Sequence, residues 1–169
     1  NYQSSVMKKI YALLLIIVMA GCSKNEATKK EDQNFNFKEP EQAPSNYTPK
    51  AGAVDMKTLD LNPEGLFCLT GSDVPYTGKV FSLWANGNVE VEGSYKDGKP
   101  DGLTTSWYAT GEKKDQVAYK DNNREGIQIQ WHKNGKKKME QVFNAGKLFS
   151  ENFWDKDGNS VNSYDEANK

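Results

Sequence analysis

The residues best suited to catalysis are few and scattered in this chain. His132 is the only histidine among the 169 residues, and Cys22 and Cys68 are the only cysteines. A single histidine without a cysteine pair gives no zinc-ligand spacing and no credible catalytic triad. Acidic residues are scattered, and no pair of them recurs at equivalent positions. The sequence therefore predicts a protein that is not an enzyme and needs neither a metal nor a cofactor.

Two further features could suggest chemistry but are better explained by structure. Cys68 lies in an apolar stretch, residues 66–69, so we expect a buried and inert thiol. The alternative is an exposed cysteine that takes part in redox chemistry or pairing. Gly98-Lys99 and Gly146-Lys147 are predicted to be turns rather than phosphate-binding loops, because no helix follows either of them.

Three aromatic residues stand 24 positions apart and are candidates for binding. Trp84, Tyr108 and His132 occupy the same place in successive segments of similar sequence. We expect them on a polar sheet face, where neighbouring segments would stack them into a ladder. Aromatic side chains on a solvated face can anchor a partner. The alternatives are that they only support the sheet through cross-strand contacts, or that the sheet curls so that both of its faces are partly covered.

A second candidate is a group of lysines near predicted hairpin tips. The same 24-residue spacing would bring these tips side by side, and the resulting basic patch would suit anionic lipid head-groups or an acidic protein surface. A solvated edge that discourages aggregation is the alternative interpretation. The group comprises Lys113, Lys114, Lys133, Lys136, Lys137 and Lys138.

The elements that must position these side chains are three repeats of 24 residues across 78–147. Glycines recur at that spacing in two series, and an aromatic residue recurs in a third. Such a period indicates stacked supersecondary units that cannot bury an apolar face alone. Within each unit, segments alternate with period two and break at Gly or Asn, which predicts β-hairpins. The series are Gly78, Gly102 and Gly126; Gly87, Gly111 and Gly135; and Tyr95, Tyr119 and Phe143.

The loop length decides the predicted register of each hairpin. A two-residue turn would pair Trp84 with Val89 and mix apolar and acidic side chains on one face. A three-residue loop, with Gly87 in the left-handed conformation, pairs Leu83 with Val89. We favour the second register, because a slip by one residue would move the whole apolar set into water.

Carried along the array, this register predicts one buried face. Lys113, Asp115, Lys137 and Gln141 are polar exceptions on it, which are expected near open hairpin tips or would indicate an error in the register. The apolar members of the predicted face are Phe81, Leu83, Val89, Val91, Tyr95, Leu103, Trp107, Val117, Tyr119, Ile127, Ile129, Trp131, Met139 and Phe143.

The segments that flank the repeats are predicted to be irregular ends. Residues 54–77 hold two short predicted strands around an Asn62-Pro63-Glu64-Gly65 turn, and we expect them to cap the array. Residues 148–169 resemble a fourth unit that is one residue short, followed by a polar tail. The predicted fold class is all-β, an antiparallel meander of hairpin repeats.

The N-terminal part is predicted to direct export and tethering. Residues 1–21 comprise an extension before Met7, a basic Lys8-Lys9 pair and an apolar run of ten residues, which suits a signal peptide but is too short to span a bilayer. Residues 22–53 are polar and contain several prolines, and we expect a disordered tether with a reach of roughly 30 Å. The tether would hold the folded part clear of the membrane surface.

Two resemblances bear on function. Met19-Ala20-Gly21-Cys22 resembles the lipobox of bacterial lipoproteins, which implies a lipid anchor on Cys22. Ser23 is not the aspartate associated with inner-membrane retention, so an outer-membrane or surface location is expected if the cell has two membranes. Residues 64–160 resemble MORN repeats of the bacterial variant type, through Pro75-Tyr76-Thr77-Gly78-Lys79, Tyr95-Lys96-Asp97-Gly98-Lys99, Gly102, Trp107-Tyr108, Gly111 and Phe143-Asn144-Ala145-Gly146-Lys147.

The MORN resemblance implies a twisted meander and a binding or scaffold role without catalytic residues. Some relatives are labelled antitoxins, and others are proposed to meet membranes or proteins. A net charge of −1 gives no reason to expect a nucleic-acid partner. We therefore expect a lipid-anchored module of the cell envelope that binds another protein, with an antitoxin-like or immunity role as one form of that function. The alternative is a peripheral binder of anionic lipid head-groups or cell-wall polymer through the lysine tips.

Overall fold

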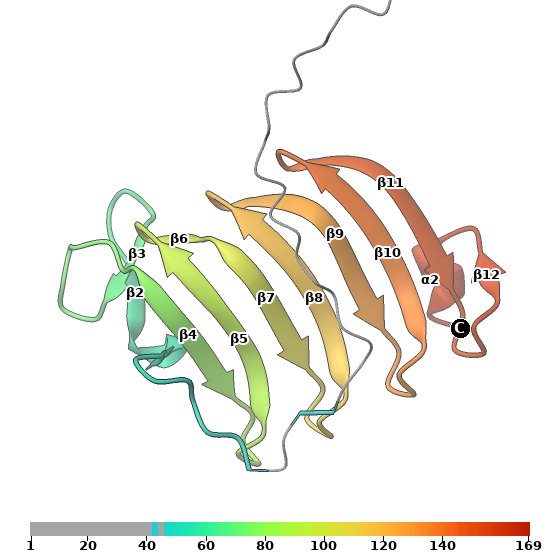
Figure 1. Cartoon of the computed structure of the whole chain (residues 1–169), viewed down its shortest axis with the longest axis horizontal. Helices are drawn as coiled ribbons and strands as arrows, with labels where there is room; N and C mark the ends of the chain where they lie inside the picture. Colours follow the sequence, from blue (N-terminus) through green and yellow to red (C-terminus); the bar gives the residue numbers. More distant parts are fainter. Residues whose placement is uncertain (1–41, 44–45) are drawn as a thin grey trace, which may run out of the picture. The chain divides into compact units, whose positions relative to one another are not determined.

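The computed structural model describes residues 42–43 and 46–169, which belong to one compact unit. The predicted signal peptide, Cys22 and most of the predicted tether lie outside the described residues. Strands dominate the described part (Figure 1). The elements are β1 (Val54–Asp55), η1 (Met56–Thr58), β2 (Leu59–Leu61), β3 (Phe67–Leu69), β4 (Gly78–Leu83), β5 (Val89–Lys96), β6 (Lys99–Pro100), β7 (Gly102–Trp107), β8 (Lys113–Lys120), β9 (Asn123–Trp131), β10 (Lys137–Asn144), β11 (Lys147–Trp154), β12 (Ser160–Val161) and α2 (Tyr164–Ala167).

The strands form the predicted meander. A 10-stranded sheet runs in the order β1-β4-β5-β7-β8-β9-β10-β11-β12, with β6 beside β5, and β2 pairs with β3 in a separate small sheet. From β4 to β12 the neighbours along this path are antiparallel, whereas β1 joins β4 in parallel. The expected all-β fold class is confirmed.

The predicted loop is confirmed at the tip of the first hairpin. Leu83 pairs with Val89, and Gly87 has a φ of 85°. The Trp84 amide donates to the Asn88 carbonyl at 2.8 Å, and the Gly87 amide donates to the Trp84 carbonyl at 2.9 Å. These bonds close a tight turn that is followed by a left-handed glycine, as a three-residue loop requires.

The prediction of a single apolar face is wrong, because a β-bulge follows each of these loops. Leu83 pairs with Val89, but Ser82 pairs with Val91, so Glu90 is an extra residue in β5. An extra residue changes the face on which the following side chains lie. Apolar side chains are consequently divided between both faces of the sheet. The equivalent extra residues are Lys114 in β8 and Lys138 in β10.

Two cross-strand rows define these faces. We call the first the capped face; its row is Val91, Ser106, Asp115, Gln130, Met139 and Phe153, each paired with the next. We call the second the arm face, after the N-terminal arm of residues 46–53 that packs on it. Its row is Phe81, Glu92, Thr105, Gln116, Ile129, Glu140 and Asn152. Phe81 and Val91, which were expected on one face, therefore lie on opposite faces.

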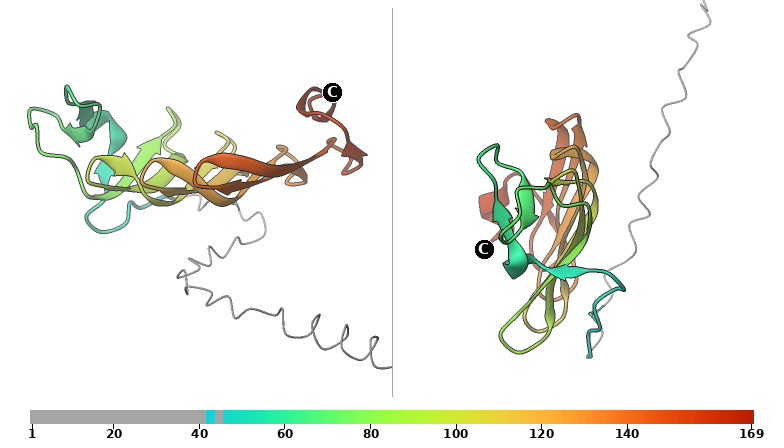
Figure 2. Two further views of the ribbon diagram at one scale, coloured as in Figure 1. Left: turned by 90° about the horizontal axis from the view of Figure 1, so that it is seen from above. Right: turned by 90° about the vertical axis from the view of Figure 1, so that its left-hand side faces the viewer.

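Both ends of the capped face are covered by the flanking segments. At one end, Leu59 forms a buried cluster with Val80 and Tyr95. At the other end, Ala167 of α2 packs in a buried cluster with Met139 and Phe153. Figure 2 shows the two flanking segments on the same side of the sheet. Residues 54–77 and 148–169 thus cover the two ends of the array.

Turns of two residues join successive hairpins and use positive φ angles. Asp97 and Gly98 form the first of them, at φ values of 49° and 74°. Asn122 takes the place of the glycine in the second, at 68°, which an asparagine tolerates better than most residues do. Ala145 precedes Gly146 in the third, at 47°. The turns keep one geometry although their residue types differ.

Candidate binding surfaces

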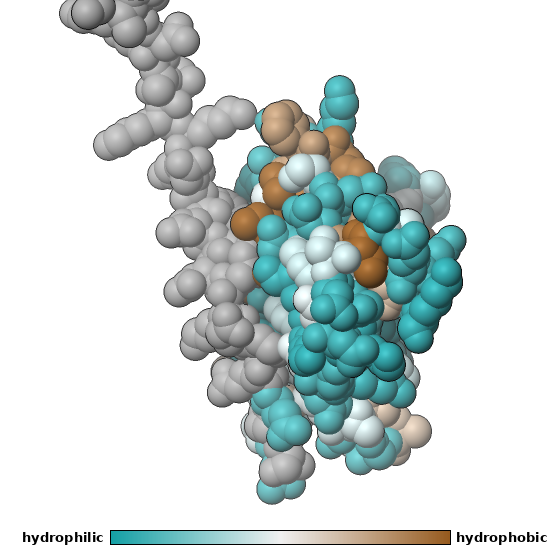
Figure 3. All heavy atoms as spheres, turned by 90° about the vertical axis from the view of Figure 1, so that its right-hand side faces the viewer, coloured by the Kyte–Doolittle hydropathy of each residue, from teal (hydrophilic) through white to brown (hydrophobic). Residues whose placement is uncertain are grey.

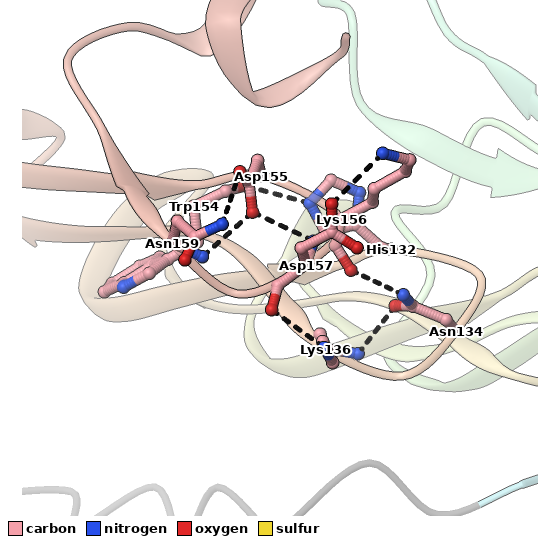
Figure 4. Close-up of polar contacts among 8 residues, drawn as sticks. All are labelled: His132, Asn134, Lys136, Trp154, Asp155, Lys156, Asp157 and Asn159. Atoms are coloured by element: carbon pink, nitrogen blue, oxygen red, sulfur yellow. Dashed lines mark hydrogen bonds and ion pairs between the residues drawn. The ribbon is translucent and has the colours of Figure 1, made fainter.

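The predicted aromatic ladder connects successive units through polar contacts with the backbone. Trp84 donates its ring N–H to the Trp107 carbonyl at 3.1 Å, and Tyr108 donates its hydroxyl to the Trp131 carbonyl at 2.9 Å. In the last unit, the ring nitrogen Nε2 of His132 lies 2.9 Å from the carbonyl oxygen of residue 154 (Figure 4). The geometry matches the alternative interpretation, a support for the sheet, while a role in binding stays a prediction.

The hairpin loops repeat this pattern. The Asn86 side chain donates to the Ala109 carbonyl at 2.8 Å. The Asn134 side chain donates to the Lys156 carbonyl at 2.7 Å (Figure 4). These contacts hold each loop against its neighbour, so the hairpin tips are aligned as the 24-residue period predicts.

The fourth loop is organised by a carboxylate. Asp155 accepts backbone hydrogen bonds from Asp157 at 2.9 Å and from Asn159 at 2.8 Å, and it also accepts one from the Asn159 side chain (Figure 4). These donors, the Asn159 side chain most of all, lower the pKa of Asp155. The last loop is therefore closed on itself.

Removal of one contact between units is expected to lower stability modestly. Tyr108→Phe deletes the hydroxyl that reaches the Trp131 carbonyl, and we expect the free energy of unfolding to fall by about 1 kcal/mol. Tyr95→Phe is the matched control, because the Tyr95 hydroxyl makes no hydrogen bond within the described part of the chain. Urea denaturation followed by tryptophan fluorescence would measure both variants. Equal effects of the two substitutions would contradict the role assigned to Tyr108.

The six candidate lysines occupy different kinds of position. The bulges separate Lys113 and Lys137, which pair with residues of the preceding strand, from the extra residues Lys114 and Lys138. The Lys133 ammonium lies 5.7 Å from the centre of the Tyr108 ring. A common basic surface formed by these lysines stays a prediction.

Two more of these lysines contact the C-terminal segment. Lys136 donates its ammonium to the Asp157 carbonyl at 2.8 Å (Figure 4). The Lys138 ammonium lies 4.6 Å from the centre of the Tyr164 ring in α2. Both side chains thus help to hold the last loop and the second cap against the array.

Lys113 and Lys137 were the basic exceptions on the predicted buried face, and aromatic rings explain both. The Lys113 ammonium lies 5.4 Å from the centre of the Trp131 ring, and this lysine is 6% exposed. The Lys137 ammonium lies 5.2 Å from the centre of the Trp154 ring. A long aliphatic stem can cover apolar surface while its charged head meets the π-face of a ring. These two lysines serve the packing of the array.

The middle of the capped face is polar and lies between the two caps, which stand at its ends in Figure 2. Its central residues are Ser106, Asp115 and Gln130. A hollow of about 380 Å³ lies beside α2, and a smaller one of about 130 Å³ lies beside the first cap. We call these three residues and the two hollows the trough.

Asp115 is the titratable group at the centre of the trough. Gln128 donates to its carboxylate at 2.9 Å. Burial raises the pKa of Asp115, and hydrogen bonds from Gln128 and Gln130 oppose that rise. Because the folded state holds this proton more tightly than the unfolded state does, Asp115 favours folding at low pH. That contribution is lost as the pH rises from the usual carboxyl range through the raised pKa.

Replacement of Asp115 by asparagine should therefore alter the pH dependence of stability. We expect Asp115→Asn to be more stable than the original protein at neutral pH, since the amide keeps an oxygen acceptor for Gln128 without a partly buried charge. The difference should shrink as the pH falls below the ordinary carboxyl pKa. Unfolding midpoints in urea between acidic and neutral pH would test this. If the difference in stability between the two proteins stayed constant across this pH range, the raised pKa of Asp115 would be contradicted.

An N-terminal arm, residues 46–53, packs on the arm face. Tyr47 donates its hydroxyl to Glu92 at 2.7 Å, and the Lys50 ammonium lies 2.8 Å from the same carboxylate. The Tyr47 ring lies 6.0 Å from the Phe81 ring, measured between centres. Burial, with Glu92 adding to it, raises the pKa of Tyr47. Sequence reasoning missed this contact, because a polar segment without periodicity carries no signal for it.

Other candidate chemistry is limited within the described part of the chain. Cys68 is buried and free, and burial raises the pKa of its thiol, which agrees with an inert side chain. Among the described residues, no cluster of three or more histidine, cysteine or acidic side chains is placed to hold a metal ion. The helices of this part also lack the length and the apolar content that crossing a membrane requires.

Comparison with known families bears directly on the repeats. Residues 76–97 and 124–145 match the MORN repeat variant. Each match begins within two residues of the first strand of a unit and ends in the two-residue turn after the second strand, so the matched units coincide with hairpins of the structure. Two hairpin units of this chain therefore match the MORN repeat variant. No curated protein and no solved structure matches the chain.

Proposed function

We propose that this protein is a lipid-anchored MORN-repeat module that binds another protein at the cell envelope. The observation that carries the proposal is the trough. Its two ends are covered by the chain's own caps, whereas its middle presents Ser106, Asp115 and Gln130 between two hollows that are lined in part by apolar side chains. A surface with polar groups between such hollows suits recognition of a protein segment.

The anchor belongs to the proposal because of the lipobox-like segment that ends at Cys22. A lipid chain there would hold the repeats near the membrane and limit their search for a partner to its surface. An antitoxin-like or immunity role would fit such a module if the partner were a toxin that acts in the envelope. Cys22→Ala should release the protein from the membrane fraction, and retained association would contradict the anchor.

The trough can be tested by site-specific photo-crosslinking in cells with the full chain. A crosslinker in place of Ser106, on the capped face, should give a discrete adduct with one protein. Ile129 is the matched control, because it lies in the same sheet but in the row of the opposite face, and it is partly exposed as Ser106 is. Adducts of equal yield at both positions, or none at Ser106, would overturn the proposal.

The alternative, a binder of anionic lipid through the lysines, makes a different prediction. Flotation of the Cys22→Ala chain with vesicles of anionic phospholipid should then depend on the six lysines, and their replacement by glutamine should abolish it. Several of those lysines already contact aromatic rings or a carbonyl of the same chain. We therefore expect no lysine-dependent binding to such vesicles.

A further inference from the structure

The last long strand of the sheet has a free side. β11 pairs with β10 along its length but with β12 only at Phe153 and Trp154. The residues from Lys147 to Asn152 therefore have no second neighbouring strand in the described chain, and all of them are exposed. At the opposite end of the sheet, β1 pairs with β4 and the arm packs nearby. The β11 side thus leaves a long edge of backbone donors and acceptors unpaired.

An apolar patch lies on this edge. Leu148 is 42% exposed and Phe149 is 82% exposed. Val142 pairs with Ser150 and Phe143 pairs with Leu148, so Phe149 is the extra residue of a bulge and has no partner in β10. In Figure 3, which faces this end of the sheet, apolar surface is exposed near the top. A large aromatic side chain that is exposed and unpaired in its own sheet suggests a contact with another chain.

We propose that two copies of this protein join edge to edge through residues 147–152 of β11. Lys147 and Glu151 stand two residues on either side of Phe149. When two such edges align antiparallel with their Phe149 residues at the centre, Lys147 of each copy comes beside Glu151 of the other. The edge is thus complementary in charge to itself, and its aromatic residues meet across the two-fold axis.

The same features explain how this edge avoids indiscriminate pairing. A lysine on the edge opposes the addition of an arbitrary strand, because its charge would lose contact with water. A bulge opposes it as well, because it interrupts the row of backbone hydrogen bonds that the added strand would make. A second copy supplies the opposite charge at the matching place and the same bulge at the centre. The surface therefore selects its own sequence over others. The contact leaves Ser106, Asp115 and Gln130 of each copy uncovered, whereas Glu151 also lines the hollow beside α2.

Sedimentation of the full chain in detergent tests the dimer. We expect the original protein to dimerise and Phe149→Lys to weaken the association at least about tenfold, because it places two like charges at the centre of the contact. Val74→Lys is the matched control, since Val74 is 73% exposed but lies outside the edge. The inference would be overturned if the original protein were monomeric, even if its β11 bound a different protein instead. A Phe149→Lys dimer as tight as the original would overturn it as well.

A charge exchange tests the antiparallel alignment. Lys147→Glu and Glu151→Lys should each weaken the dimer, because each places like charges together at both ends of the contact. The double variant restores opposite charges and should recover an affinity close to the original. Circular dichroism would show that every variant keeps its strand content. A double variant as weak as the single ones would overturn this arrangement.

Discussion

Replacing Gly98 by alanine is expected to lower the free energy of unfolding by roughly 2–5 kcal/mol, the sum of backbone strain and steric overlap. Gly98 has a φ of 74°, and a Cβ there would lie 2.7 Å from Leu66 Cβ and 3.1 Å from the Phe67 backbone. The Phe67 amide donates to the Gly98 carbonyl at 2.9 Å, and the Gly98 amide donates to the Tyr76 carbonyl at 2.9 Å. The added methyl group would therefore push the first cap away from the turn that holds it.

Gly87→Ala separates the two parts of this effect. Gly87 has a similar φ of 85°, but nothing lies within 4 Å of the position that a Cβ would take there. That variant should lose only the contribution of backbone strain, roughly 1–2 kcal/mol. Urea unfolding of the two variants in the Cys22→Ala background would measure the difference. Equal losses would show that the first cap does not depend on the Gly98 contact.

The destabilisation caused by Gly98→Ala should also be detectable where the first cap packs on the capped face. The first cap buries Leu59 against Val80 and Tyr95, and the Phe67 ring meets the Tyr95 ring edge-on at 5.0 Å. If the cap loosens, the amide of Tyr95 should exchange with solvent faster relative to that of Met139, which packs under the other cap. Gly87→Ala should leave the ratio of the two exchange rates close to its original value.

The periodic features of the fold could be predicted from sequence because they depend on local rules. The 24-residue spacing of glycines and aromatic residues indicates hairpins, and the three-residue loop at Gly87 follows from the need to pair Leu83 with Val89. Turn geometry and cross-strand pairing within one hairpin involve residues that are close in the chain. Sequence patterns report such contacts directly.

The bulges could not be predicted, because the extra residues carry no distinctive type. Glu90, Lys114 and Lys138 are charged residues of the kind found at any solvated strand position. One signal was present: a regular register placed Lys113 and Asp115 on a buried face, and that conflict arises where the register shifts. Polar exceptions that recur at the repeat spacing can therefore indicate an irregularity in the strand.

The candidate site was only partly predictable for a related reason. The equivalence of Trp84, Tyr108 and His132 was evident, but their partners are backbone carbonyls, which the order of side chains does not reveal. The arm contact between Tyr47 and Glu92 joins residues 45 positions apart, and the arm lies outside any repeat. The trough likewise depends on where the two caps dock, and that is a property of tertiary packing.

Deletion of Gln116 is expected to unfold the protein, whereas deletion of Lys114 is expected to be tolerated. Without Gln116, every later residue of β8 moves by one place and changes face. Val117 would take the buried place of Gln116, Tyr119 would leave the capped face for the fully buried place of Ala118, and the exposed Lys120 would take the place of Tyr119. Overpacking one buried site costs about 1–3 kcal/mol, and the misplaced Val117 and Lys120 add to that cost, so the combined loss approaches the stability of a small domain, about 5–15 kcal/mol.

Deletion of Lys114 removes only the extra residue of the bulge. Lys113 can still pair with Trp107, and Asp115 can still pair with Ser106, so both faces keep their side chains. The fourth hairpin already has this arrangement, because β11 and β12 pair without a shift in register. We expect a loss of about 1–2 kcal/mol from the altered strand twist. Circular dichroism and urea unfolding would compare the two deletions, and similar losses for both would show that the bulge, rather than the alternation beyond it, fixes the register of the sheet.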